Sequence, residues 1–328
     1  MASEPQPTGD RAAADRSQLS SAAPLRVGVL GTGHLGRHHV RILAEMDTTE
    51  LVGIYDQKPE VAAELATRHK TTSFSSAEEL WDRVDAVVLA VPTFAHASLT
   101  LRMLERGLHV LVEKPMASSL GEADAMSAAC GSDQILAVGH VEFYNPAVQQ
   151  LLQIDQPPRF LEAQRLSPFT PRSLDVDVIL DLMIHDLQIL HALDPSPLVE
   201  VRATGVDVLS SRIDIANARL EFESGLTANV TASRVSAESI RKLRVFLHRR
   251  YLSVDYREQQ AHGFALRENG ETRTIVPADL AVERVEPLRA ELDAFVAACR
   301  GEAVPYVDAA AGRQALETAL RVRDAIGR

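Results

Sequence analysis

The chain has 328 residues, of which 46% are hydrophobic and 24% charged, the balance of a globular protein long enough for two domains. Its net charge of -11 argues against a surface that binds nucleic acid, because phosphate backbones are held by basic patches. The two cysteines and the lack of a long apolar run argue against a disulfide framework and a membrane span, so we expect a cytoplasmic protein. No spacing typical of a metal site occurs, and we expect no metal.

Residues 1–23 are rich in Ala, Ser, Pro and charge and lack the apolar core of a signal peptide, so we expect a disordered tail. From Leu25, short apolar runs alternate with segments of helical spacing. The expected strands are Arg26–Leu30, Leu51–Tyr55, Ala86–Val91, His109–Glu113 and Ile135–Gly139. The expected helices are His34–Glu45, Pro59–His69, Ala77–Trp81, His96–Glu105 and Leu120–Cys130. This α/β alternation predicts a doubly wound parallel sheet, a Rossmann domain over residues 24–145.

The pattern then changes to a succession of strands with one strong helix among them, Val176–Ala192. The expected strands are Phe160–Leu166, Val199–Val208, Ala216–Glu223, Leu226–Arg234, Leu243–His248 and Leu252–Tyr256. Two amphipathic helices, Glu286–Arg300 and Asp308–Ile326, close the chain, and the last is a candidate to pack back on the Rossmann domain. We therefore predict an α+β domain over residues 146–328, with a large open, mostly antiparallel sheet. An open sheet face needs a cover, so we expect a homodimer or homotetramer formed through it.

A glycine loop of the form G-x-G-x-x-G follows the first strand and opens a helix. An acid, Asp56, ends the second strand 20 residues beyond the last glycine, as a dinucleotide-binding unit requires. Its carboxylate suits ribose hydroxyls and repels a 2′-phosphate, so NAD is favoured over NADP, although the nearby Lys58 softens that repulsion. The alternative is a glycine turn with a capping aspartate. The predicted cofactor residues here are Gly31, Gly33, His34, Leu35, Gly36 and Asp56.

Three further polar segments follow strands, at the sheet edge where α/β proteins bind ligands. They are Val91-Pro92-Thr93 with His96, Glu113-Lys114-Pro115, and Glu142-Phe143-Tyr144-Asn145. A lysine after a buried strand is costly to leave unpaired, and a surface turn is the alternative. In the later helix, Asp181 and His185 stand four apart on one face, which suits a carboxylate-assisted general base and equally a structural hydrogen bond.

Together these segments resemble the Gfo/Idh/MocA oxidoreductase family. The resemblance rests on Gly31 to His39, the Glu113-Lys114-Pro115 triplet and Asp181-x-x-x-His185-Asp186. It implies that Lys114 orients or polarises a reacting hydroxyl, that His185 takes its proton, and that Asp181 holds substrate or tunes the histidine. It also implies that Val91, Pro92, Thr93, His96, Glu113 and Lys114 line the nicotinamide side. The implied reaction is hydride transfer between a sugar or polyol carbon and nicotinamide.

A narrower resemblance concerns the segments Val138–Val148 and Asp177–Asp186, which look like those of UDP-N-acetylglucosamine 3-dehydrogenases. It implies oxidation of a nucleotide-sugar 3-hydroxyl. Phe143 departs from that pattern, because an arginine is common at its position. Candidate substrate residues are Tyr144, Asn145, Arg165 and Arg172, with the Arg241 to Arg244 cluster as further cations for a diphosphate. A dehydrogenase of free sugars or inositols, and a non-catalytic NAD-binding regulator, remain as alternatives.

Overall fold

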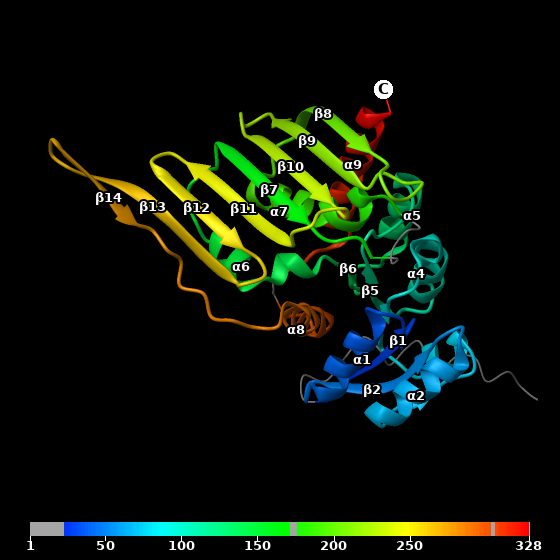
Figure 1. The fold of residues 1–328 in the computed structure, drawn as a ribbon. Helices are drawn as coiled ribbons and strands as arrows, with labels where there is room; N and C mark the ends of the chain where they lie inside the picture. Colours follow the sequence, from blue (N-terminus) through cyan, green and yellow to red (C-terminus); the bar gives the residue numbers. More distant parts are fainter. Residues whose placement is uncertain (1–22, 171–175, 303–305, 328) are drawn as a thin grey trace, which may run out of the picture. The chain divides into compact units, whose positions relative to one another are not determined.

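The computed structural model describes residues 23–170, 176–302 and 306–327. The expected disordered tail and the candidate Arg172 therefore lie outside the described residues, apart from Ala23. Chain contacts divide the molecule into two units, one with residues up to Val138 and 292–309, the other with residues 139–291 and 310 onward. Each unit is built around its own sheet (Figure 1).

The first unit holds a six-stranded parallel sheet in the order β3-β2-β1-β4-β5-β6, which confirms the predicted Rossmann architecture. The strands are β1 (Leu25–Leu30), β2 (Thr49–Tyr55), β3 (Thr72–Ser73), β4 (Ala86–Leu89), β5 (His109–Glu113) and β6 (Leu136–Gly139). The helices are α1 (Gly36–Glu45), α2 (Pro59–His69), α3 (Ala77–Trp81), α4 (His96–Leu104) and α5 (Leu120–Ala129). Every residue of β4 and β5 is buried, because helices cover both faces of a parallel sheet. The order reverses between β1 and β4, and the glycine loop leaves β1 at that point.

The second unit holds an eight-stranded sheet in the order β14-β13-β12-β11-β7-β10-β9-β8. Its strands are β7 (Phe160–Leu166), β8 (Leu198–Val206), β9 (Ile215–Phe222), β10 (Thr227–Ser233), β11 (Ile240–Leu247), β12 (Arg250–Asp255), β13 (Gln260–Asn269) and β14 (Thr272–Pro277). Among the described strand pairs of this sheet, β7 and β10 are parallel and the others are antiparallel. The predicted mostly antiparallel sheet is therefore confirmed. Strands β13 and β14 were not expected.

One face of this second sheet carries helices α6 (Pro146–Leu152), α7 (Ile184–Leu193) and α9 (Ala309–Ile326), which lie behind it in Figure 1. The strands alternate accordingly: in β7, Leu161, Ala163 and Arg165 are buried, and the residues between them are partly exposed. Helix α8 (Pro287–Cys299) groups with the first unit from Leu292 onward, whereas α9 groups with the second. The helix that returns to the Rossmann unit is thus α8. None of the described helices is long and apolar enough to cross a bilayer.

Candidate active site

The three glycines of the loop after β1 are needed for different reasons. Gly31 has a φ of +86°, and a Cβ on it would lie 2.3 Å from the carbonyl oxygen of Ala90, just after β4. A Cβ on Gly36 would lie 1.8 Å from the carbonyl oxygen of Gly31. A Cβ on Gly33 would meet no atom within 4 Å. Packing therefore requires the first and third glycines, and the second leaves its backbone open to a ligand.

The helix that follows the loop is ready to receive an anion. Its N-cap is Leu35, which offers no side-chain hydrogen bond to the helix, and its first turn carries no acidic residue. Backbone amides and the positive end of the helix dipole are therefore available to phosphate oxygens. The open Gly33 backbone and this helix start together fit the pyrophosphate of a dinucleotide.

Asp56, directly after β2, is tied to the glycine loop. Its Oδ2 accepts hydrogen bonds from the backbone N–H and the hydroxyl of Thr32, at 2.6 and 2.9 Å. Its Oδ1 accepts one from the backbone N–H of Lys58 at 2.9 Å. The carboxylate is thus held beside the loop, where a dinucleotide site places its ribose-binding acid.

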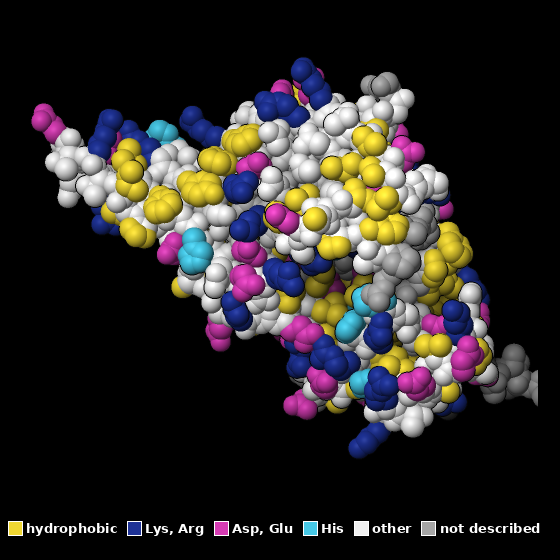
Figure 2. Space-filling view, viewed as in Figure 1, with side chains coloured by type: hydrophobic (Ala, Val, Ile, Leu, Met, Phe, Trp, Pro, Cys, Tyr) yellow, Lys and Arg dark blue, Asp and Glu magenta, His cyan; other side chains and the backbone are white. Residues whose placement is uncertain are grey.

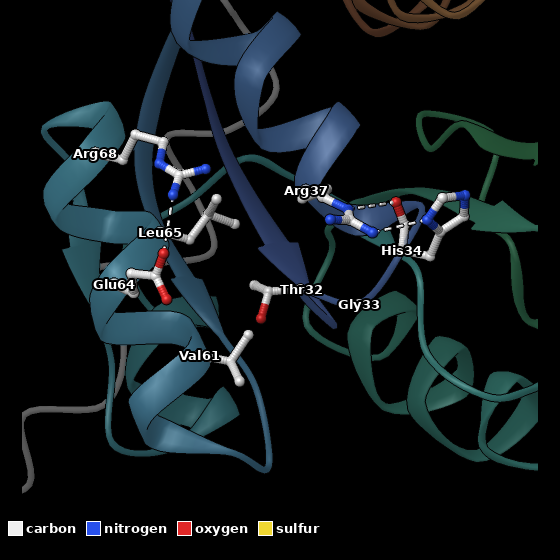
Figure 3. A pocket seen from close by; sticks show the side chains of 8 residues that line it. All are labelled: Thr32, Gly33, His34, Arg37, Val61, Glu64, Leu65 and Arg68. Atoms are coloured by element: carbon white, nitrogen blue, oxygen red, sulfur yellow. Dashed lines mark hydrogen bonds and ion pairs between the residues drawn. The ribbon is translucent and has the colours of Figure 1, made fainter.

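A pocket of about 320 Å³ lies beside the loop (Figure 3). Thr32, Gly33, His34 and Arg37 line it on one side, and Val61, Glu64, Leu65 and Arg68 of α2 line it on the other. Both arginines have local partners: Arg37 Nη2 lies 2.7 Å from His34 Nδ1, and Arg68 pairs with Glu64 at 2.9 Å. The pocket therefore offers a mixed apolar and polar lining next to Asp56 and the phosphate loop.

The predicted nicotinamide segments occupy the ends of β4 and β5 in the same unit. Val91 and Thr93 are partly exposed and Pro92 is exposed, and a short 3₁₀ turn (Thr93–Ala95) follows. His96, at the start of α4, is instead buried, and burial lowers the pKa of its imidazole. Lys114 is partly exposed between two buried neighbours and precedes a cis peptide bond to Pro115. Sequence reasoning assigned His96 to ligand contact, but the ring is turned into the protein.

In the second unit, Asp181 lies within an irregular helical turn, and His185 follows that turn in α7. Residues Ile179–Met183 form a π-helical turn that leads directly into α7, and such turns occur frequently at functional sites. Asp181 is partly exposed, whereas His185 is 8% exposed and its ring makes an edge contact with that of His140, at 5.7 Å between centroids. The segment thus carries a carboxylate on a partly exposed residue and a largely buried imidazole, both of them groups that can transfer protons.

The residue after His185 is anchored in a buried ion-pair cluster. Asp186 accepts two hydrogen bonds from Arg165 of β7, at 2.8 and 2.9 Å, and Glu142 accepts a third at 2.6 Å. Arg165 is 3% exposed, and its guanidinium lies over the ring of Tyr256 at 5.0 Å. Burial by itself lowers the pKa of Arg165, but Asp186 and Glu142 raise it well above its usual value. The Arg165 side chain is therefore bound to α7, the helix that carries His185.

The other predicted substrate residues also have defined surroundings. Asn145 donates to the carbonyl oxygen of Tyr256 at 2.8 Å and accepts from the amide of Ala147 at 3.1 Å, so its side chain caps α6. Tyr144 is buried beside it. Within the basic cluster, Arg244 pairs with Glu162 on the sheet face that carries no described helix, whereas Arg241 is half-exposed on the opposite face and lies 3.5 Å from Glu142. Strand alternation thus separates Arg241 from its neighbours.

Sequence reasoning gave no role to His39, His140, Glu142 or Asp186. Glu142 and Asp186 each stand in a largely apolar segment of the sequence. A carboxylate in such a segment must be paired if it is buried, and this was the available signal. Their partner Arg165 lies on a distant strand, and the sequence gives no indication of that contact. His39 stands on the buried face of the predicted helix after the glycine loop, where a polar side chain also needs a partner.

Comparisons with known proteins agree with this geometry. The sequence profile of the oxidoreductase family Gfo/Idh/MocA, with an NAD-binding Rossmann fold, matches residues 25–140. The chain is 39% identical over 308 residues to UDP-N-acetylglucosamine 3-dehydrogenase of Acidithiobacillus ferrooxidans, covering 92% of this chain and 97% of that protein. A solved structure of that enzyme has a TM-score of 0.86 at 38% identity, covering 93% of this chain and 98% of that one. Inositol 2-dehydrogenase 2 of Paenarthrobacter aurescens is 26% identical, over 86% of this chain and 90% of that protein.

Proposed function

The chain belongs to the Gfo/Idh/MocA oxidoreductase family, and we propose that it oxidises the 3-hydroxyl of a nucleotide sugar such as UDP-N-acetylglucosamine with NAD. The family comprises NAD(P)-dependent dehydrogenases that act on CH–OH groups, and this chain carries the NAD(P)-binding Rossmann domain. The observation that carries the substrate proposal is the 39% identity to UDP-N-acetylglucosamine 3-dehydrogenase, which extends across 97% of that enzyme and so includes the second unit.

The proposed chemistry assigns the proton to the protein and the hydride to the cofactor. Bound NAD supplies the hydride acceptor, and the substrate C–OH becomes C=O. The ammonium of Lys114 donates a hydrogen bond to the reacting oxygen and orients it. His185 accepts the hydroxyl proton at a ring nitrogen, and Asp181 orients the histidine or holds the substrate. Support comes from the partly exposed Lys114 after β5 and from the His185 imidazole in α7, directly after the π-helical turn.

For the substrate diphosphate we propose Arg241. It is the cation of the basic cluster that lies on the helix-bearing face of the second sheet, and 48% of its side chain is exposed. Arg165 and Asn145 are proposed to stabilise the site rather than to bind the substrate, because their side chains make ion pairs and hydrogen bonds within the second unit. Tyr144 is a further candidate for contact with the sugar.

We propose NAD rather than NADP as the working cofactor. The Asp56 carboxylate, held by the backbone amides of Thr32 and Lys58, would accept hydrogen bonds from the ribose hydroxyls and would repel a 2′-phosphate. The nicotinamide end of the proposed cofactor site is formed by Val91, Pro92, Thr93 and Glu113. The pyrophosphate end is formed by the loop residues Gly31 to Gly36. The ratio of kcat/KM for NAD and NADP measures this preference, and Asp56→Ser should shift it toward NADP.

We propose a cytoplasmic homodimer or homotetramer, joined through the sheet face that carries no described helix. A row of side chains runs across that face in register: Phe160, Phe246, Tyr251, Phe264 and Pro277. Figure 2 shows hydrophobic side chains gathered over this part of the sheet. Phe264→Asp should lower the mass measured by light scattering, and Val285→Asp, an exposed control outside the sheet, should not. The cytoplasmic assignment is supported by free thiols at Cys130 and Cys299.

The substrate test is a panel assay that follows NADH at 340 nm while a carbonyl trap removes the ketone. UDP-N-acetylglucosamine should give NADH, and the unphosphorylated polyols should give none. Turnover with inositols alone would favour the function suggested by the 26% identical inositol dehydrogenase. NADH binding without turnover of any substrate in the panel would favour a non-catalytic regulator.

A further inference from the structure

Two buried histidines hold the loop that carries Lys114, one on each side of it. We propose that His39 and His96 are positioning residues for Lys114, fixing Glu113 and Pro115 so that the lysine side chain projects in one direction. The inference rests on the proposed role of Lys114 in the reaction. It gives a function to two side chains that do not themselves face the substrate.

His39 holds the N-terminal side of the loop. It lies on α1, the helix that follows the glycine loop, and its side chain is fully buried. Its Nε2 lies 2.7 Å from Oε1 of Glu113, so the ring N–H donates to the carboxylate. The other oxygen of Glu113 accepts the backbone N–H of Lys114 at 3.3 Å. The chain His39–Glu113–Lys114 therefore connects the phosphate-binding helix to the backbone of the lysine.

His96 holds the C-terminal side. One ring nitrogen, Nδ1, lies 2.9 Å from the carbonyl oxygen of Pro115, and Nε2 lies 2.8 Å from that of Val91. Both partners are acceptors and a neutral imidazole has a single N–H, which we assign to Nδ1, so that it donates to the carbonyl oxygen of Pro115. The ring thus sits between the loop after β4 and the loop after β5, the two segments proposed to surround the nicotinamide.

Lys114 is the exception in an otherwise closed segment. From Leu111 to Ala117 every residue is buried except Lys114. With the backbone fixed on both sides, the lysine side chain is the part of the loop that can reach a ligand. Catalysis depends steeply on such placement, since a displacement of about 1 Å can cost on the order of 10²-fold in rate.

The test is a double-mutant cycle measured on the full-length protein with its substrate. His39→Leu and His96→Leu should each lower kcat by roughly 10- to 100-fold, with KM for NAD changed less than threefold. In the Lys114→Ala background, the same substitutions should lower the residual kcat no further, because they act through the lysine. His39→Gln and His96→Asn each keep an N–H near the original donor and should recover part of the lost kcat.

A second readout needs no turnover. Hydrogen–deuterium exchange of the peptide covering residues 109–117 should speed up in His39→Leu and in His96→Leu, and less in His39→Gln and His96→Asn. Exchange in the second unit, such as in the strand Phe160–Leu166, should stay unchanged in all four variants. This control separates a local loss of order from a general loss of stability.

The outcomes separate the inference from the function on which it rests. If Lys114→Ala retains full turnover, the proposed role of the lysine is wrong. If Lys114→Ala keeps only a small residual kcat but the leucine variants keep wild-type kcat and wild-type exchange, the lysine has its role and the positioning proposal is wrong. Equal losses of activity in the wild-type background and in the Lys114→Ala background would also overturn it, because they would indicate a purely structural effect.

Discussion

The two units hold their candidate catalytic side chains by different kinds of interaction. In the Rossmann unit, Lys114 is placed by hydrogen bonds of His39 and His96 to the flanking loop. In the second unit, the helix of His185 is anchored by Arg165, which is buried between Asp186 and Glu142. The Rossmann unit thus uses one imidazole–carboxylate contact and one hydrogen bond between uncharged groups, which contributes about 1 kcal/mol, whereas Arg165 bonds two buried carboxylates, and a buried charge left without its partner costs several kcal/mol. The second arrangement should therefore be far less tolerant of single substitutions.

The largest expected effect comes from removing the charge at the centre of the second arrangement. Arg165→Met leaves the buried Asp186 without its cation and leaves Glu142 with the half-exposed Arg241, and should lower the free energy of unfolding by about 3–5 kcal/mol. Urea denaturation measures it. Arg244→Met is the matched control, since this arginine pairs with Glu162 at 2.8 Å in a half-exposed position and should cost less than about 1 kcal/mol. Similar losses in the two variants would contradict the comparison.

A smaller effect concerns the other end of the same helix. Burial lowers the pKa of His191 to about 4, against the opposing influence of Asp194 and Glu317. Because the folded-state pKa lies below the unfolded value, the unfolded chain takes up the proton first. Stability is therefore complete above about pH 6.5 and falls as the pH drops toward 4, by about 3 kcal/mol at this residue.

His191→Gln keeps a donor for Thr318, which lies 2.7 Å from the histidine Nε2, and removes the titration. Unfolding free energies measured by urea denaturation between pH 7 and 4 should decline less in this variant than in the wild type. Burial also lowers the pKa of His96 and His109 in the Rossmann unit, so part of the decline should remain. Parallel curves for the variant and the wild type would show that His191 contributes nothing.

The smallest effect on stability is expected at the glycine loop, where a substitution can weaken NADH binding without changing the free energy of unfolding. Gly33→Ala adds a Cβ that meets no protein atom, so stability should change by about 0.5 kcal/mol or less. NADH binding, measured by fluorescence, should weaken at least about tenfold, because the added Cβ keeps the dinucleotide away from the loop backbone. A loss of about 1.4 kcal/mol in binding free energy corresponds to that factor. Gly31→Ala should instead destabilise the fold by about 1–3 kcal/mol, owing to its positive φ and the nearby Ala90 carbonyl. Unchanged NADH affinity in Gly33→Ala would exclude the loop from the cofactor site.

The Rossmann unit was predictable from the sequence because its elements have local signals. Buried parallel strands appear as apolar runs, and the glycine loop, Pro59 and the capping Ser119 mark where turns and helices begin. Strands β13 and β14 were missed because most of their side chains are exposed, so the period-two alternation that identifies a strand is weak. Strand β13 forms by pairing with β12, and β14 forms by pairing with β13.

The candidate site was predictable only where a motif names the residue. The glycines, Asp56, Lys114 and His185 have fixed places in such motifs, whereas the partners of Arg165 depend on strand register and helix packing. That is why sequence reasoning assigned Arg165 to a substrate diphosphate, while the structure surrounds it with two carboxylates and an aromatic ring. His96 was assigned to the cofactor for the same reason, since its position in the segment is visible and its orientation is not.

The most direct test of the proposed chemistry measures turnover and NAD binding in the same two variants, Lys114→Ala and His185→Ala. If the two side chains orient the hydroxyl and take its proton, each variant should lose NADH formation with UDP-N-acetylglucosamine and still bind NAD as the wild type does. Wild-type turnover in both variants would contradict the assigned chemistry.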